Sequence, residues 1–283
     1  KHLRPHTKPL SFAIGSLTVG SLMIEPTNCD WFGRKKAVPK GPLSGCTVLV
    51  TGSSRGLGLE FSKQLRDQGA TVIATCRSPK RAAELNQLGV RVEALDTTDK
   101  KSVDQIVSKL TSEGAVIDIL INNAGIASKN HPVDPILEAD EEDVLNVFRT
   151  NVLGTIRMTN ALLPLMTLSQ KKIVVNLSSD LGSIEKTFTA QSAKVKPGGV
   201  CSYRISKAAG NMASRIFAAE LGDEAIVVAM SPGWVQTDMG SSGSRVAPLT
   251  PDQSIAGMLD VITKLSPCDS GKFYSFNGSE VPF

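Results

Sequence analysis

From residue 46 onward, short apolar runs alternate with stretches in which apolar residues recur every three or four positions. The runs are rich in β-branched residues and predict strands at 46–51, 71–76, 90–95, 116–121, 172–177, 225–230 and 272–275. Between them the helical period is clear at Leu57, Phe61 and Leu65, and again over 102–110 and 141–165. Apolar strands that alternate with helices indicate a parallel sheet covered on both faces. We therefore predict one α/β domain over residues 45–283, a doubly wound parallel sheet of about seven strands.

Residues 1–44 lack this periodicity and form an N-terminal arm. They contain five of the 15 prolines, and their uncharged stretch, 11–24, is too short to span a bilayer and is rich in Gly and Ser. A basic start followed by an apolar stretch resembles a signal-peptide core or part of an organelle-targeting segment. Three interpretations remain open: a disordered arm, a retained targeting sequence, or a segment that docks onto a protein assembly or a membrane surface.

The positive charge of the chain is concentrated in this arm. Of the formal net charge of +4, residues 1–44 hold +5, so the remainder is close to neutral at −1. A nucleic-acid surface on the domain is therefore not expected. With 41% hydrophobic residues and no apolar run of 18, the 283-residue chain can bury a large core and is predicted to have no transmembrane helix.

The cysteines and histidines argue against disulfides and metal sites. Five cysteines are scattered without ligand spacing: Cys29, Cys46, Cys76, Cys201 and Cys268. An odd number in this arrangement favours reduced thiols, which fits the cytoplasm, the mitochondrial matrix or the plastid stroma. Because the chain has three histidines, His2, His6 and His131, we expect no metal.

The first predicted strand runs directly into a glycine-rich turn, Gly52, Gly56 and Gly58, and then into an amphipathic helix. Glycine lets the backbone turn sharply and approach a pyrophosphate, and the helix N-terminus behind it presents free N–H groups. Glycines also mark ordinary turns, but this position after the first strand of a β/α series indicates a dinucleotide site.

The end of the second strand indicates which nucleotide binds there. NAD sites place a carboxylate at this point, whereas this chain has Cys76 and Arg77, the latter 19 positions after Gly58. A guanidinium pairs with a 2′-phosphate that a carboxylate would repel, and Arg55 in the loop is a second candidate. Unless both arginines are simply solvated, NADP(H) is favoured over NAD(H).

Further motifs follow in order, and together they give the chain a family resemblance. They are Thr51-Gly-x-x-x-Gly-x-Gly58, Asp96, Asn122-Asn-Ala-Gly125, Asn151, Ser179, Tyr203-x-x-x-Lys207 and Pro232-Gly233. Over residues 46–283 the chain resembles the short-chain dehydrogenases/reductases, and in particular the sniffer-like carbonyl reductases and bacterial C-factor proteins. The resemblance implies a Rossmann-type fold and an oxidoreductase.

The resemblance also implies four catalytic residues. Tyr203 and Lys207 lie one helical turn apart, so the ammonium and the positive nicotinamide of the oxidised cofactor are expected to lower the pKa of the phenol, which would act as general acid. Ser179 would hydrogen-bond the substrate carbonyl, and Lys207 would also bind the nicotinamide ribose. Asn151 would hold a water that links Lys207 to solvent; alternatively, it bonds to backbone across a helix bend.

The remaining implied residues contact the cofactor. Asp96 and Thr97 would lie at the adenine, Asn123 to Gly125 at the adenosine, and Pro232 to Thr237 at the nicotinamide. The full predicted cofactor set is Thr51, Gly52, Ser54, Arg55, Gly56, Leu57, Gly58, Arg77, Asp96, Thr97, Asn123, Ala124, Gly125, Tyr203, Lys207, Pro232, Gly233, Val235 and Thr237.

The chain departs from the family pattern between Ser179 and Tyr203, which are 24 positions apart, about twice the usual spacing. The inserted residues, 186–199, should rim the substrate mouth. The short tail, 277–283, should leave that mouth open, and the helices around 141–165 and 203–221 suggest a homodimer by analogy with relatives.

These observations lead to two hypotheses about function. The first is an NADPH-dependent reductase of small aldehydes, ketones or quinones. The second, suggested by the arm, is an accessory or structural subunit that keeps the fold, with or without bound nucleotide, inside a larger assembly.

Overall fold

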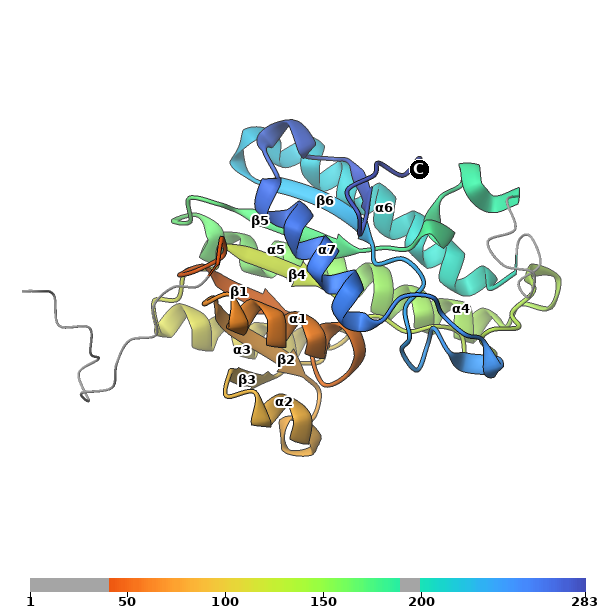
Figure 1. The fold of residues 1–283 in the computed structure, drawn as a ribbon, viewed down its shortest axis with the longest axis horizontal. Coiled ribbons are helices and arrows are strands. Elements are labelled where there is room, and N and C mark those ends of the chain that lie inside the picture. Colours follow the sequence, from red (N-terminus) through yellow and green to blue (C-terminus); the bar gives the residue numbers. More distant parts are fainter. Residues whose placement is uncertain (1–40, 189–198) are drawn as a thin grey trace, which may run out of the picture. The chain divides into compact units, whose positions relative to one another are not determined.

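The computed structural model describes residues 41–188 and 199–283, and within them seven strands form one parallel sheet in the order β3-β2-β1-β4-β5-β6-β7 (Figure 1). The strands are β1 (Thr47–Val50), β2 (Thr71–Cys76), β3 (Arg91–Ala94), β4 (Ile119–Asn122), β5 (Ile173–Leu177), β6 (Ile226–Ser231) and β7 (Phe273–Ser275). The predicted doubly wound α/β fold is confirmed, and the observed strand ends differ from the predicted ones by at most three residues.

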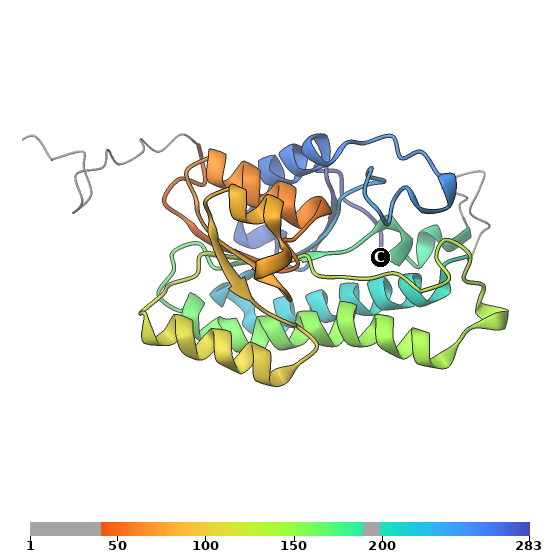
Figure 2. The same ribbon diagram turned by 90° about the horizontal axis from the view of Figure 1, so that it is seen from below.

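The helices cover both faces of the sheet (Figure 2). They are α1 (Gly56–Asp67), α2 (Ala83–Gln87), α3 (Lys100–Ser112), α4 (Glu141–Phe148), α5 (Gly154–Met166), α6 (Cys201–Leu221) and α7 (Pro251–Lys264). Successive residues of a strand point to opposite faces, so Val48 and Val50 pack with α1, α2 and α7, whereas Leu49 packs with α3, α5 and α6. Both faces of the sheet are therefore buried.

The predicted single helix over 141–165 is interrupted. A π-helical turn, Arg149–Leu153, separates α4 from α5. Inside this turn the Asn151 side chain bonds the backbone of Ile126 in the loop after β4. Periodicity alone does not reveal such a bend, because the apolar face continues on both sides of it.

The predicted arm and most of the predicted insertion, 186–199, lie outside the described residues. Leu43 belongs to the core and is fully buried, so the packing of the domain reaches at least two residues before the predicted boundary at 45. In the described part of the chain no helix has the length and apolar character needed to cross a membrane.

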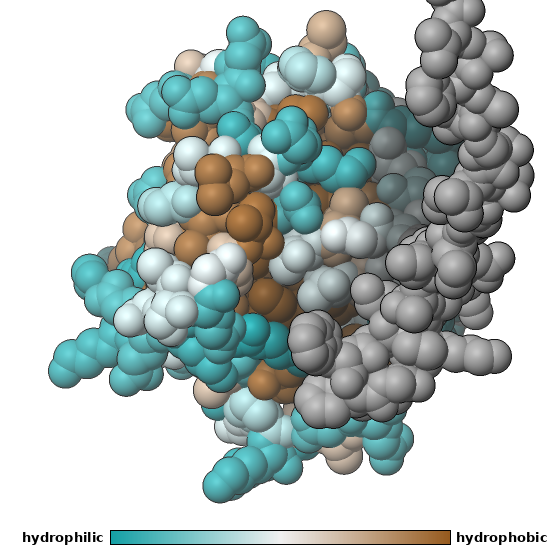
Figure 3. All heavy atoms as spheres, turned by 90° about the vertical axis from the view of Figure 1, so that its left-hand side faces the viewer, coloured by the Kyte–Doolittle hydropathy of each residue, from teal (hydrophilic) through white to brown (hydrophobic). Residues whose placement is uncertain are grey.

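The order of the strands creates one place for a ligand. In the sheet, β2 and β3 lie on one side of β1, and β4 lies on the other side. Loops leaving β1 and β4 therefore diverge at the carboxyl ends of these strands and open a crevice there. Figure 3 shows the other end of the domain, at the amino ends of the strands, where apolar side chains gather among hydrophilic ones.

Candidate functional site

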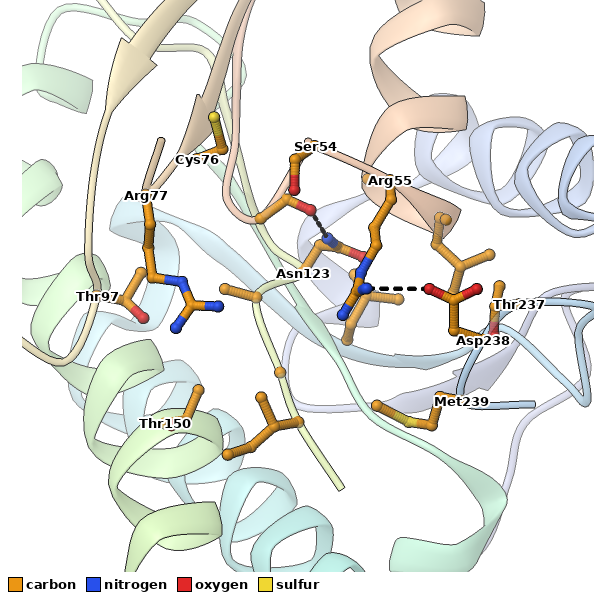
Figure 4. Close-up of a pocket in the computed structure, with 18 of the residues that line it drawn as sticks. Ser54, Arg55, Cys76, Arg77, Thr97, Asn123, Thr150, Thr237, Asp238 and Met239 are labelled. Atoms are coloured by element: carbon orange, nitrogen blue, oxygen red, sulfur yellow. Dashed lines mark hydrogen bonds and ion pairs between the residues drawn. The ribbon is translucent and has the colours of Figure 1, made fainter. Parts of the chain in front are cut away.

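A cavity of about 410 Å³ opens at the carboxyl ends of β1 to β6 (Figure 4). Sixteen of the predicted site residues line it, namely Gly52, Ser54, Arg55, Gly56, Leu57, Gly58, Arg77, Asp96, Thr97, Asn123, Ala124, Gly125, Tyr203, Lys207, Pro232 and Thr237. The motifs are far apart in the chain, and the parallel sheet brings them together because its strands all end at the same edge.

The glycine-rich turn leaves no room for side chains. Gly52 has a φ of +71°, and a Cβ there would lie 2.9 Å from the Cα of Ala124. A Cβ on Gly58 would lie 2.3 Å from the carbonyl oxygen of Gly52. The backbone thus forms a narrow cradle that only glycine can build.

The start of α1 faces this cradle without a cap. The residue before the helix, Arg55, makes no capping hydrogen bond, and the first turn contains no acidic residue. The first N–H groups of a helix have no partner within the helix, and together with the helix dipole they attract an anion. The cradle and these donors fit the pyrophosphate of a dinucleotide.

Thr51 and Asn123 hold the turn in place. The hydroxyl oxygen of Thr51 accepts hydrogen bonds from the backbone N–H groups of Asn123 and Ala124, both at 3.0 Å. The Asn123 amide donates to the carbonyl oxygens of Thr51 and Gly52, at 2.8 and 3.1 Å. Thr51 does not line the cavity. In the structure it joins the β1 and β4 loops, and its predicted contact with the cofactor stays a prediction.

The two arginines proposed as phosphate readers differ in their surroundings. Arg55 forms an ion pair with Asp238 at 3.1 Å, and both side chains are largely exposed. Arg77 extends over the cavity beside Thr97 and makes no hydrogen bond or ion pair within the described residues (Figure 4). Its guanidinium is therefore the better placed of the two to receive a phosphate.

Asp96 lies in the loop after β3. Burial opposes its ionisation, but hydrogen bonds from the Thr98 N–H and hydroxyl, with the charges of Arg77 and Arg157, hold the pKa of this carboxyl below its usual value. The ionised carboxylate organises the turn at 96–98, and Asp96 and Thr97 both line the cavity.

Tyr203 and Lys207 lie on α6, and both face the cavity. The Lys207 ammonium lies 5.4 Å from the centre of the Tyr203 ring and donates to the carbonyl oxygen of Leu177 at 2.6 Å. Burial lowers the pKa of Lys207 to about 8. Ser179 lies near the Tyr203 phenol and favours its ionised form, and the Ser179 oxygen accepts from the N–H of Leu181 at 3.2 Å.

In the chain by itself, burial raises the pKa of Tyr203 to about 12, and Ser179 opposes this only in part. The Lys207 ammonium lies over the ring and is bonded to Leu177, so burial dominates. The phenol therefore carries its proton at neutral pH but is a weaker acid than a free phenol. The predicted lowering also involves the oxidised nicotinamide, so for the protein with bound cofactor it stays a prediction.

Asn151 does not line the cavity. Its oxygen accepts from the N–H of Ile126 at 2.8 Å, and its amide donates to the Ile126 carbonyl and to the Ser206 hydroxyl, each at 2.9 Å. These are the backbone contacts across a helix bend that the sequence left as an alternative. Its predicted part in a proton relay through water stays a prediction.

Gly233 and Val235 shape the loop after β6 but do not line the cavity. Gly233 has a φ of +75°, and Val235 is buried and bridges to Leu249. Ten further residues line the cavity that were not predicted: Cys76, Leu95, Thr98, Ile126, Asn146, Thr150, Leu177, Ser178, Asp238 and Met239. Most of them adjoin a motif in sequence, as Thr150 adjoins Asn151, whereas Asn146 lies in α4 and carries no sequence signal.

Comparison with known proteins agrees with this geometry. A family model described as short chain dehydrogenase matches residues 46–245. The C-signal protein of Myxococcus xanthus is 39% identical over 168 residues, which cover 59% of this chain and 93% of that protein. A carbonyl reductase from chicken fatty liver, solved with NADPH bound, is 34% identical with a TM-score of 0.76, over 85% of this chain and all of that one. Carbonyl reductase Sniffer of Drosophila melanogaster is 29% identical with a TM-score of 0.75, over 84% and 100%.

Proposed function

The chain belongs to the short-chain dehydrogenase family and is an oxidoreductase, and we propose that it reduces an aldehyde, ketone or quinone to an alcohol with NADPH. The observation that carries the proposal is the cluster of Tyr203, Ser179 and Lys207 beside the nucleotide cavity. A phenol that is protonated at neutral pH and lies near a hydroxyl and an ammonium is suited to protonating a carbonyl oxygen.

The choice of NADPH rests on the charges around the cavity. Arg77 extends over it without a partner in the described structure, at the point where the sequence has no carboxylate to repel a 2′-phosphate. The similar chicken carbonyl reductase was solved with NADPH bound, which supports the same choice. Arg55 would have to leave Asp238 to contribute, so we assign it the smaller part.

The roles of the protein groups follow from their positions. When bound, NADPH supplies the hydride that the carbonyl carbon receives. Ser179 donates a hydrogen bond to the carbonyl oxygen, and Tyr203 gives that oxygen its proton. The tyrosinate left behind is stabilised by the Lys207 ammonium, whose low pKa of about 8 allows it to pass a proton on.

The proposal is tested by following NADPH and, separately, NADH oxidation with a panel of aldehydes, ketones and quinones. The chain has two tyrosines, Tyr203 and Tyr274, so Tyr274→Phe is a matched control for Tyr203→Phe. We expect turnover with NADPH that disappears in Tyr203→Phe and persists in Tyr274→Phe. Turnover that survives Tyr203→Phe would contradict the assignment of the proton donor, and faster turnover with NADH would contradict the assignment of the cofactor.

A further inference from the structure

The helix that carries Tyr203 begins in an unusual way. Val200, the residue before α6, has φ +57° and ψ +50°, and its side chain makes no capping hydrogen bond. A β-branched residue in this left-handed conformation is uncommon and persists only when its surroundings hold it there. Val200 is buried, so the start of α6 is held by packing and by groups from elsewhere in the chain.

Asp134, in the loop between β4 and α4, supplies those groups. Its carboxylate accepts from the N–H of Ser202 at 2.9 Å, and its backbone carbonyl accepts from the N–H of Cys201 at 2.8 Å. The second carboxylate oxygen lies 3.4 Å from the Cys201 sulfur. Burial raises the pKa of the Cys201 thiol, so the thiol keeps its proton and donates. Asp134 is 4% exposed, and all three contacts end on the two residues directly before Tyr203.

The first turn of a helix frays most easily, and Tyr203 lies within it. Lys207 lies one turn further in and is anchored on Leu177. Fraying at the start of α6 would therefore move the phenol away from Ser179 while the ammonium stayed in place. A negative charge at a helix N-terminus opposes this fraying by capping and through the helix dipole.

We infer that Asp134 is a positioning residue for catalysis: by capping α6 from a distant loop, it holds the Tyr203 phenol against Ser179. The inference rests on the proposed function, because it concerns the proton donor of that reaction. Asp134 does not line the cavity, so it acts on the reaction through Tyr203 and not through the nucleotide.

The loop has a second anchor, so removing the Asp134 side chain should not release it. The Nε2 atom of His131 lies 2.6 Å from Arg245 Nη2 and 3.2 Å from the carbonyl oxygen of Met239. The test compares Asp134→Ala and Asp134→Asn with Asp140→Ala as matched control. Asp140 caps α4 in the same way, by accepting from the N–H of Asp143, but that helix does not carry Tyr203.

The kinetic readouts are kcat, the NADPH dissociation constant, and the isotope effect on kcat with NADPH deuterated at the transferred position. We expect Asp134→Ala to lower kcat by about 10- to 100-fold and to raise the isotope effect, because small misplacements of a catalytic group cost this much. NADPH affinity should stay within about twofold, since the cradle is untouched. Asp134→Asn keeps an acceptor for the Ser202 N–H and should restore part of kcat, and Asp140→Ala should change none of these values.

A second readout does not need activity. In a Tyr274→Phe background Tyr203 is the sole tyrosine, so absorbance at high pH reports its ionisation alone. The added Asp134→Ala change should hydrate the phenol and move its titration down by about one pH unit from about 12, toward the free value near 10. If the wild-type chain reduces no carbonyl, the proposed function fails while this titration still tests the positioning. An unchanged titration would overturn the inference. It would also be overturned if activity fell only by the fraction of protein that no longer binds NADPH, with an unchanged isotope effect.

Discussion

Replacing Arg77 with Gln should weaken the binding of NADPH much more than the binding of NADH. Arg77 makes no hydrogen bond or ion pair in the described part of the chain, so its full donor set can pair with a 2′-phosphate. Hydrogen bonds to charged groups contribute about 1.5–3 kcal/mol each. Because every 1.4 kcal/mol is a factor of ten, the loss of one such bond should weaken NADPH about 10- to 150-fold. NADH lacks the phosphate and should change less than about threefold.

Arg55→Gln is the matched comparison. Its guanidinium is 3.1 Å from Asp238, and with side chains 80% and 77% exposed this pair resembles other solvent-exposed ion pairs. To bind a phosphate, Arg55 would have to break its ion pair with Asp238, and both partners are screened by solvent. We therefore expect Arg55→Gln to lower NADPH affinity by less than about fivefold. Dissociation constants for both nucleotides, measured at one ionic strength by protein fluorescence quenching, test both variants. A loss in Arg77→Gln that is equal for NADH and NADPH, or a larger loss in Arg55→Gln, would refute the assignment of Arg77.

Three other predictions follow from the cradle and the buried groups. Gly58→Ala places a Cβ 2.3 Å from the carbonyl of Gly52 and should abolish nucleotide binding in calorimetry; wild-type affinity would contradict the cradle. Burial lowers the pKa of the Lys207 ammonium from 10.5 to about 8, so below pH 8 the buried charge destabilises the folded wild type by about 3 kcal/mol. Lys207→Met removes this destabilisation but also removes the hydrogen bond to Leu177, which cancels part of the gain. The variant should be inactive, and urea unfolding at pH 7 should show it to be more stable than wild type by about 1–2 kcal/mol. This gain in stability should fade between pH 8 and 10.5, because Lys207 loses its proton in the folded wild type before it does in the unfolded chain. A gain in stability that is independent of pH would argue against this cause. Thr51→Val leaves the Ala124 N–H unpaired and the Asn123 N–H with only the Ile121 carbonyl, so it should cost about 1–3 kcal/mol in urea unfolding, while Thr51→Ser should restore most of it.

Much of the site followed from short-range rules. Gly52 and Gly58 were identified because a phosphate turn tolerates no side chain, and the structure puts backbone where their Cβ atoms would be. Tyr203 and Lys207 were taken from the family motif, and helix geometry explains why residues one turn apart face the same way. These properties depend on local backbone geometry, so a single stretch of chain is enough to reveal them.

Other features depend on atoms brought from far along the chain. The rise of the Tyr203 pKa depends on burial, which the helix period does not report. The contacts of Asn151 with Ile126 and Ser206 exist only because the loop after β4 folds against the bend before α5. Asn146 was missed because it lines the cavity from α4, which has no motif of its own.

The sequence by itself therefore determined the succession of strands and helices and the phosphate turn, because alternating patterns and glycine positions act over a few residues. The predicted roles of Tyr203 and Lys207 came from the family resemblance. Only the tertiary structure decided which arginine extends unpaired over the cavity, how burial sets the protonation of Tyr203 and Lys207, and which residue caps their helix. Those properties depend on which groups lie close together in space and on how far water is excluded from them. The groups can be far apart in the chain, as Arg55 and Asp238 are at 183 positions, so no local pattern encodes these properties.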